Sequence, residues 1–282
     1  MKKVLLLIAV YKRIDITEKC YKWLIEKTIP WFAAHAVEVQ PLIIYSEEQH
    51  KRLAQIYNFD YIFADNAPLG KKHNIGLRGA LNFEWDYLLQ LGSDDFMSFE
   101  GVQAIAKALH GGEKWGGFNR LLVGSIDSEL IHEVETSQIF GAGRFIHREL
   151  VEKACYVAWC YCFAFVRGTN AIYRPGKDYI LPIHFINEKS HCLKKNASLP
   201  RPLLWRDEIN QGLDTDSQNQ IWKIYPHSPT LLETKQPAIF DLKSKTNIHH
   251  IEKFQQYPLS PIKSNQIFSI FEGESVMNEF SY

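Results

Sequence analysis

The chain of 282 residues has no net charge and no apolar run long enough to cross a membrane. Lys plus Arg and Asp plus Glu each number 32, so no overall field attracts nucleic acid or an anionic membrane. A nucleic-acid partner is therefore disfavoured, although a local patch leaves it open. The uncharged stretch 154–166 falls well short of the roughly 20 residues that span a bilayer, and we expect no transmembrane segment.

Cysteine is also scarce, with five in the whole chain. Cys155, Cys160 and Cys162 lie in the apolar stretch, and their spacing matches neither a zinc pair nor a redox pair. Free, buried thiols are typical of a reducing compartment, so we expect a cytoplasmic protein. Repeats and low-complexity tracts are absent, and 46% hydrophobic residues can fill a substantial core. We expect residues 1–282 to form a single domain.

The pattern of apolar residues alternates between strand-like and helix-like segments. The expected strands are 4–10, 37–45, 61–63 and 86–91, followed by a looser set at 118–124, 129–135 and 240–244. The expected helices lie near 16–24, 47–57, 71–83, 98–109, 149 onward, 207–211 and 216–224, with Ser46 and Ser98 as helix caps. Such alternation is typical of an α/β fold with a mostly parallel sheet and helices on both faces.

Four residues that follow the strand at 86–91 point to function: Gly92, Ser93, Asp94 and Asp95. Ligands of open α/β sheets bind at the carboxyl ends of strands. Two adjacent carboxylates repel each other unless a positive charge lies between them, and a divalent cation carrying a diphosphate meets that need. An ordinary turn that ends the strand is the alternative, because Ser and Asp are common turn residues.

The segment before this strand strengthens the first interpretation. Residues 70–80 read Gly-Lys-Lys-His-Asn-Ile-Gly-Leu-Arg-Gly-Ala, a basic, glycine-rich helix start that adds the positive field of a helix N-terminus. Across 66–95 the order of basic helix, strand and acid pair resembles family 2 glycosyltransferases with the GT-A fold. The resemblance implies a Rossmann-like nucleotide-binding sheet in 1–110, and an acceptor-binding half with a C-terminal extension in 111–282.

The resemblance also implies a role for each acid. Asp94 would hydrogen-bond a ribose, and Asp95 would bind Mg²⁺ or Mn²⁺ bridging the diphosphate oxygens. The family's DxD signature has an Asp where this chain has Gly92, so a further protein ligand gains importance. His249 and His250, after the expected strand at 240–244, are candidates, and an exposed histidine pair is the alternative.

Further donor-binding positions are implied at the ends of the first and third strands, at the basic helix start and in a glycine loop. They are Tyr11 for the base, Arg13 for phosphate, Asp65 for a pyrimidine edge, Lys71, Lys72 and Asn74 from the helix start, and Gly143 beside the donor sugar. The open alternatives are turns for Asp65 and Gly143 and a solvated helix face for the lysines.

Segment 205–214 resembles the family's acceptor-side motif. By position Asp214 matches the catalytic base, although Leu213 replaces the Glu that usually precedes it. Asp207 is the second candidate base, and Glu208 completes the earlier acidic pair. A helix cap at Asp214 is the alternative. Tryptophans that could form a platform under an acceptor sugar, or else belong to the core, are Trp159, Trp205 and Trp222.

Together these features predict a metal-dependent glycosyltransferase that moves a sugar from a nucleotide-diphosphate donor, with UDP favoured, to a hydroxyl acceptor such as a saccharide. Inversion is favoured by the position of Asp214 alone. A sugar-phosphate nucleotidyltransferase is a weaker alternative, because the loop 9–15 contains no glycine. A non-catalytic GT-A-like module, carbohydrate-binding or structural, is the third hypothesis.

Overall fold

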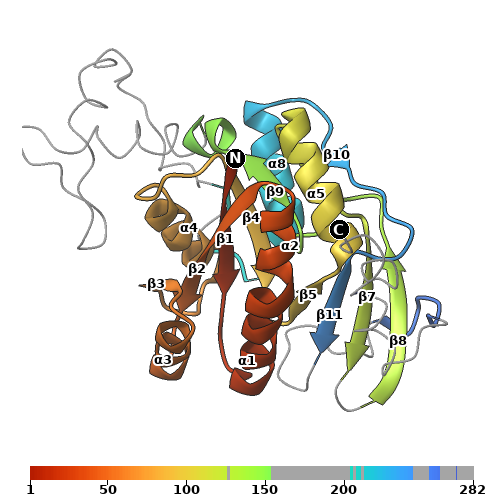
Figure 1. Ribbon diagram of the computed structural model, residues 1–282, viewed down its shortest axis with the longest axis horizontal. Coiled ribbons are helices and arrows are strands. Elements are labelled where there is room, and N and C mark those ends of the chain that lie inside the picture. Colours follow the sequence, from red (N-terminus) through yellow and green to blue (C-terminus); the bar gives the residue numbers. More distant parts are fainter. Residues whose placement is uncertain are drawn as a thin grey trace, which may run out of the picture.

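The computed structural model describes residues 1–125, 128–153, 204–205, 208–210, 213–243, 254–260 and 271. They form an α/β fold in which helices cover both faces of a larger sheet and a smaller sheet lies beside it (Figure 1). The expected α/β fold, with a mostly parallel sheet, is confirmed. Among the described residues, no helix combines the length and apolarity that crossing a membrane would require.

The larger sheet has seven strands in the order β10-β6-β9-β4-β1-β2-β3. Their bounds are β1 Lys2–Ala9, β2 Val37–Tyr45, β3 Asp60–Phe63, β4 Tyr87–Gly92, β6 Trp115–Gly117, β9 Phe145–His147 and β10 Thr230–Leu231. Strands β3, β2, β1 and β4 are parallel, and β9 is antiparallel to both of its neighbours. The chain leaves β1 toward β2 and returns to β4 on the other side of β1. The edge between β1 and β4 is therefore a topological switch point, where such sheets bind ligands.

The smaller sheet joins parts of the chain that are far apart in the sequence. Its order is β5-β11-β7-β8, with bounds β5 Asp95–Met97, β7 Arg120–Ser125, β8 Ser128–Glu135 and β11 Ile239–Lys243. Strand β5 begins at the second residue of the acid pair, and β11 runs antiparallel to it. Strands β11, β7 and β8 lie to the right of the larger sheet in Figure 1. The smaller sheet thus brings a late strand against the acid pair.

Successive side chains of a strand point to opposite faces of the sheet, so helices can pack on both faces of the larger sheet. Their bounds are α1 Ile14–Trp23, a π-helical turn Leu24–Thr28, α2 Ile29–Ala34, α3 Glu48–Ile56, α4 Leu69–Ala80, α5 Phe99–Gly111 and α8 Leu213–Ile224. On β1, Leu6 and Ile8 belong to the apolar cluster that includes residues of α1, α2 and α5, whereas Leu5 and Leu7 belong to the cluster with α4 and α8. Because both faces of β1 are buried, apolar residues must follow one another along the strand without polar interruptions.

The two predicted helix caps had different outcomes. Ser98 is confirmed, because its Oγ accepts a hydrogen bond from the backbone N of Gly101 at 3.1 Å at the start of α5. Ser46 is wrong: α3 begins at Glu48, and the Ser46 hydroxyl instead donates to the carbonyl of Ala64 at 2.7 Å. The hydroxyl therefore ties the end of β2 to the end of β3, a contact between strands that local sequence does not reveal.

Candidate metal centre

Three carboxylates meet at the carboxyl edge of the larger sheet. Asp94 and Asp95 follow β4, and β11 pairs with β5 so that Asp241 lies directly opposite Asp95. One carboxylate oxygen from each of the three lies within 4.8 Å of the others. The sequence analysis identified the first two acids and missed Asp241, so the third member of this acid triad comes from the strand pairing.

Asp94 and Asp95 are buried, Asp241 is partly buried, and the three carboxylates repel one another. Burial, with Asp241 and Asp94 adding repulsion, raises the pKa of Asp95 well above its usual range. Burial likewise raises the pKa of Asp241 to about 6, against the opposing charge of Lys243, which pairs with its carboxylate. The Oδ1 atom of Asp241 is buried, and none of the described residues donates a hydrogen bond to it. Three converging carboxylates, which Arg13 and Lys243 neutralise only in part, fit a hard divalent cation such as Mg²⁺ or Mn²⁺.

Gly92 has no side chain, and the carboxylates of Asp94 and Asp95 lie close to its backbone. The backbone N of Gly92 donates to Oδ2 of Asp95 at 2.5 Å. A Cβ at this position would lie 2.8 Å from that oxygen and 2.9 Å from Oδ1 of Asp94. A side chain at Gly92 therefore does not fit the arrangement of the two acids, and Asp241 supplies a carboxylate from another strand instead.

Basic side chains border the triad. Arg13, just after β1, donates from Nη1 to Oδ2 of Asp94 at 2.5 Å and from Nη2 to Oγ of Ser93 at 3.0 Å. Lys243 Nζ lies 3.9 Å from the same Asp94 oxygen. The structure therefore brings Arg13, predicted from the sequence to contact phosphate, to the acid pair. A guanidinium and an ammonium beside a metal site suit the oxygens of a diphosphate.

Lys72 and Tyr11 lie together beside the end of β1. Lys72 is 1% exposed, and its Nζ donates to the carbonyl of Val10 at 2.6 Å and to Oδ1 of Asn66 at 3.1 Å. The same ammonium lies 5.8 Å from the centre of the Tyr11 ring. Burial lowers the pKa of Lys72 to about 7. Of the two helix-start lysines, Lys72 is thus the one that contacts the loop after β1.

The other predicted donor positions lie in different surroundings. Asp65 and Lys71 are exposed. Asn74 is buried, and its amide donates to the carbonyl of Trp205 at 2.6 Å and accepts from the backbone N of Leu204 and of Trp205, each at 3.4 Å. The structure therefore brings Asn74 to the 204–205 segment rather than to the acids. Trp205 is itself 1% exposed, which matches the core alternative for that tryptophan.

The glycine loop 141–144, which lies between β8 and β9 in the chain, contacts both β4 and the start of α8. The backbone N of Gly143, at a φ of 76°, donates to the carbonyl of Gln90 on β4 at 2.8 Å. A Cβ at Gly141 would collide with the carboxylate of Asp214, in the first turn of α8. Arg144, fully buried, places Nη2 3.5 Å from Oδ1 of Asp214. The loop therefore lies between the strand that delivers the acid pair and the predicted base.

Of the four remaining predicted site residues, the structure describes only Glu208. Glu208 is exposed. Asp207, His249 and His250 lie outside the residues that the structure describes. Sequence reasoning also missed Lys243 and the buried Arg144. A signal existed for the first, because the expected strand at 240–244 places residues 241 and 243 on one face.

No family model and no curated protein matches this chain. Among solved structures, S. aureus TarS 1–349 aligns with 11% identity and a TM-score of 0.44 over 86% of this chain and 60% of that one. The structure of TarS 1–349 in complex with UDP-GlcNAc aligns with 12% identity and a TM-score of 0.45, over 89% of this chain and 61% of that one. The mannosyltransferase PcManGT from Pyrobaculum calidifontis, in complex with GDP-Man and Mn²⁺, aligns with 13% identity and a TM-score of 0.38, over 53% of this chain and 46% of that one. The chain spans about three fifths of TarS 1–349, and likeness this distant assigns no activity.

Proposed function

We propose that this chain is a metal-dependent glycosyltransferase of the GT-A type, which moves a sugar from a nucleotide-diphosphate donor to a hydroxyl acceptor. The observation that carries the proposal is the triad of Asp94, Asp95 and Asp241 at the switch point between β1 and β4. Carboxylate oxygens are the ligands that Mg²⁺ and Mn²⁺ prefer, and diphosphate oxygens complete such a site. Asp241 supplies the third carboxylate that Gly92 does not.

The basic residues around the triad support a diphosphate ligand. A bound cation would neutralise the negative charge that develops on the departing nucleoside diphosphate. Arg13 and Lys243 are the proposed phosphate contacts, because both lie beside the triad. His249 and His250 remain candidates for one further ligand. Tyr11 and Asp65, at the ends of β1 and β3, are the proposed contacts for the base, and UDP is the proposed nucleotide.

Asp214 is the proposed general base. It would take the proton from the acceptor hydroxyl during attack on the anomeric carbon, and a base opposite the leaving group corresponds to inversion. Arg144 would position it, because its buried guanidinium lies 3.5 Å from the carboxylate. Asp207 is the second candidate base, and Glu208 belongs to the same acceptor-side segment. A saccharide is the proposed acceptor.

Calorimetry with UDP, in the presence and absence of Mn²⁺, tests the donor site. We expect Mn²⁺-dependent binding that weakens at least tenfold in Asp95→Asn and in Asp241→Asn, which keep the shape of the side chain and remove its charge. Asp15→Asn is the matched control, because Asp15 is an exposed acid in the first turn of α1. Absence of binding to any nucleoside diphosphate would contradict the transferase and leave the non-catalytic module.

Turnover tests the base. In a donor-hydrolysis assay, Asp214→Asn should lose a factor of about 10²–10⁴ in rate while its affinity for UDP stays unchanged. A variant as active as the parent would remove this assignment, and Asp207→Asn and Glu208→Gln would then be compared. Tight UDP–Mn²⁺ binding without turnover of any sugar donor would favour the non-catalytic module.

A further inference from the structure

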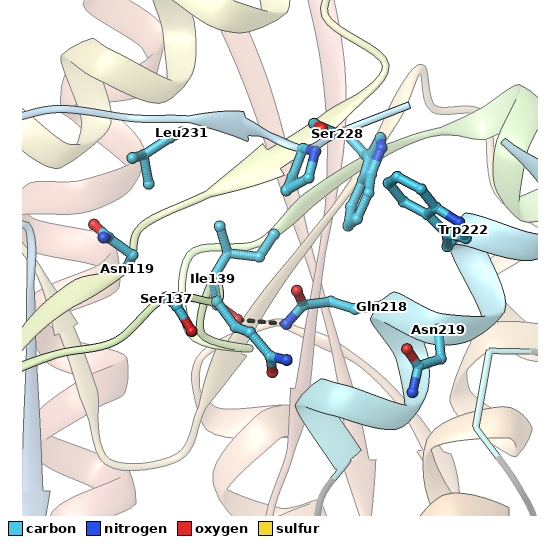
Figure 2. Close-up of a pocket in the computed structure, with 11 residues that line it drawn as sticks. Asn119, Ser137, Ile139, Gln218, Asn219, Trp222, Ser228 and Leu231 are labelled. Atoms are coloured by element: carbon cyan, nitrogen blue, oxygen red, sulfur yellow. Dashed lines mark hydrogen bonds between the residues drawn. The ribbon is translucent and has the colours of Figure 1, made fainter. Parts of the chain in front are cut away.

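A pocket lies at the β10–β6 edge of the larger sheet, and Figure 2 shows residues that line it. We call it the α8 pocket: a cavity of about 400 Å³ lined from β6, Asn119, the 137–139 turn, α8 and the 228–231 segment. Trp115 in its wall pairs with Ile146, which pairs with Leu88 near the start of β4. The acids follow the opposite end of β4, and none of them lines this pocket.

Three side-chain amides of the α8 pocket each use either the nitrogen or the oxygen, but not both, in a hydrogen bond to the protein. Nδ2 of Asn119 donates to a backbone carbonyl at 3.1 Å, and Nε2 of Gln218 donates to a backbone carbonyl at 2.7 Å. Oε1 of Gln138 accepts from a threonine hydroxyl at 3.1 Å. Among the described residues, the other end of each amide makes no hydrogen bond. Two acceptors and one donor, on side chains that are exposed or half-buried, therefore face the pocket or solvent and suit a ligand whose groups both donate and accept, as hydroxyls do.

Two indoles add apolar surface to the same wall. Trp222 on α8 is 48% exposed, which is a large exposed area for this residue type, and it lines the pocket (Figure 2). Trp115 is buried, and its Nε1 donates to the carbonyl of His227 at 3.2 Å. Only a small part of the Trp115 ring is exposed, so Trp222 offers a ligand most of the apolar surface. A sugar ring offers both an apolar face of C–H groups for an indole and hydroxyls for the amides.

The charge of the lining decides the class of ligand. None of the residues that line the α8 pocket is acidic or basic, so nothing there compensates a phosphate or a carboxylate. We propose that the α8 pocket binds a neutral saccharide at a site separate from the acid triad. The α8 pocket shares no residue with the acid triad, so the inference does not depend on the proposed donor site.

Saturation-transfer NMR on the full chain, without metal or nucleotide, tests the proposal. The probes are the methyl glycosides of glucose, galactose, mannose and N-acetylglucosamine, with methyl glucuronate as the charged comparison. We expect transfer to at least one neutral glycoside and a loss of affinity of at least tenfold in Trp222→Ala. Asn219→Ala, which changes an exposed residue of the same pocket, should also weaken binding.

Two variants serve as controls. Lys223→Ala changes the exposed neighbour of Trp222 outside the pocket, and Asp241→Asn changes the acid triad; both should bind the glycoside as the parent does. No transfer to any neutral glycoside would overturn the proposal. Binding that survives in Trp222→Ala, or that disappears in Asp241→Asn, would also overturn it, because the sugar would then lie elsewhere.

Discussion

Gly92 shows how one missing Cβ shapes the acid triad. A Cβ there would lie within 2.9 Å of oxygens on both Asp94 and Asp95, so Gly92→Ala must move the acids. We expect Mn²⁺-dependent UDP binding to weaken at least tenfold, and the free energy of unfolding to fall by about 1–3 kcal/mol, as for other overpacked sites. Calorimetry and urea unfolding measure the two effects.

Gly111→Ala is the matched control for that prediction. A Cβ at Gly111 would meet no atom within 4 Å, and the residue is helical in α5. Replacing a glycine by alanine in a helix should stabilise the protein by about 0.5–1 kcal/mol and leave binding unchanged. Equal effects of the two substitutions would contradict the steric explanation.

The lowered pKa of Lys72 makes the free energy of unfolding depend on pH. Burial lowers its pKa from 10.5 to about 7, so between these values the unfolded chain binds more protons than the folded chain. Stability contributed through Lys72 therefore rises with pH across this window, by up to about 1.4 kcal/mol per pH unit. The unfolding free energy of the parent minus that of Lys72→Met should increase from pH 7 to pH 10 in urea titrations. A flat difference would show that Lys72 titrates normally.

At the scale of elements, Arg144 connects the glycine loop to α8. Its buried guanidinium contacts the hydroxyl of Ser217 and lies 3.3 Å from the carbonyl of Ile139. Arg144→Met removes the donor from these two acceptors, and we expect a loss of about 1–3 kcal/mol of stability, because buried acceptors are then left without a hydrogen bond. Thermal unfolding measures it. Lys22→Met, which breaks an exposed pair with Glu18, is the control and should cost at most about 0.5 kcal/mol.

At the scale of the whole molecule, we propose that residues 1–282 form a single domain with a donor half (1–110) and an acceptor half (111–282). One apolar cluster contains Val4 and Val102 together with Ala238 and Ile239, so the two halves share a core. The acid triad likewise draws two acids from the first half and one from the second. Neither half would complete the site by itself.

Truncation tests this dependence. A chain that ends after residue 236 lacks β11, which removes the buried Ile239 and Phe240 and exposes the edge of β5. We expect it to lose cooperative thermal unfolding and Mn²⁺ binding. A chain that ends after residue 272 retains β11 and the buried Phe271, and should keep both properties. Cooperative unfolding of the shorter chain would contradict a shared core.

Local patterns determined most of the longer elements and part of the site. The apolar run at 37–45 matches β2 Val37–Tyr45, and Ser98 caps α5 because both signals act over a few neighbouring residues. The acid pair could be placed at the end of a strand for the same reason. Side-chain alternation also put 241 and 243 on one face of an expected strand, yet nothing local said which strand would be its neighbour.

Only the tertiary structure decided which distant residues meet. Asp241 faces Asp95 because β11 pairs with β5, Ser46 bonds Ala64 because β2 and β3 are neighbours, and Asn74 holds the backbone at 204–205. A local sequence restricts backbone angles and the direction of side chains, whereas strand partners are selected by the packing of the whole chain. The amino-acid sequence by itself therefore determined most of the longer strands and helices and two acids. The packed fold determined the short strands β5, β6 and β10, the third acid and the surroundings of all three acids.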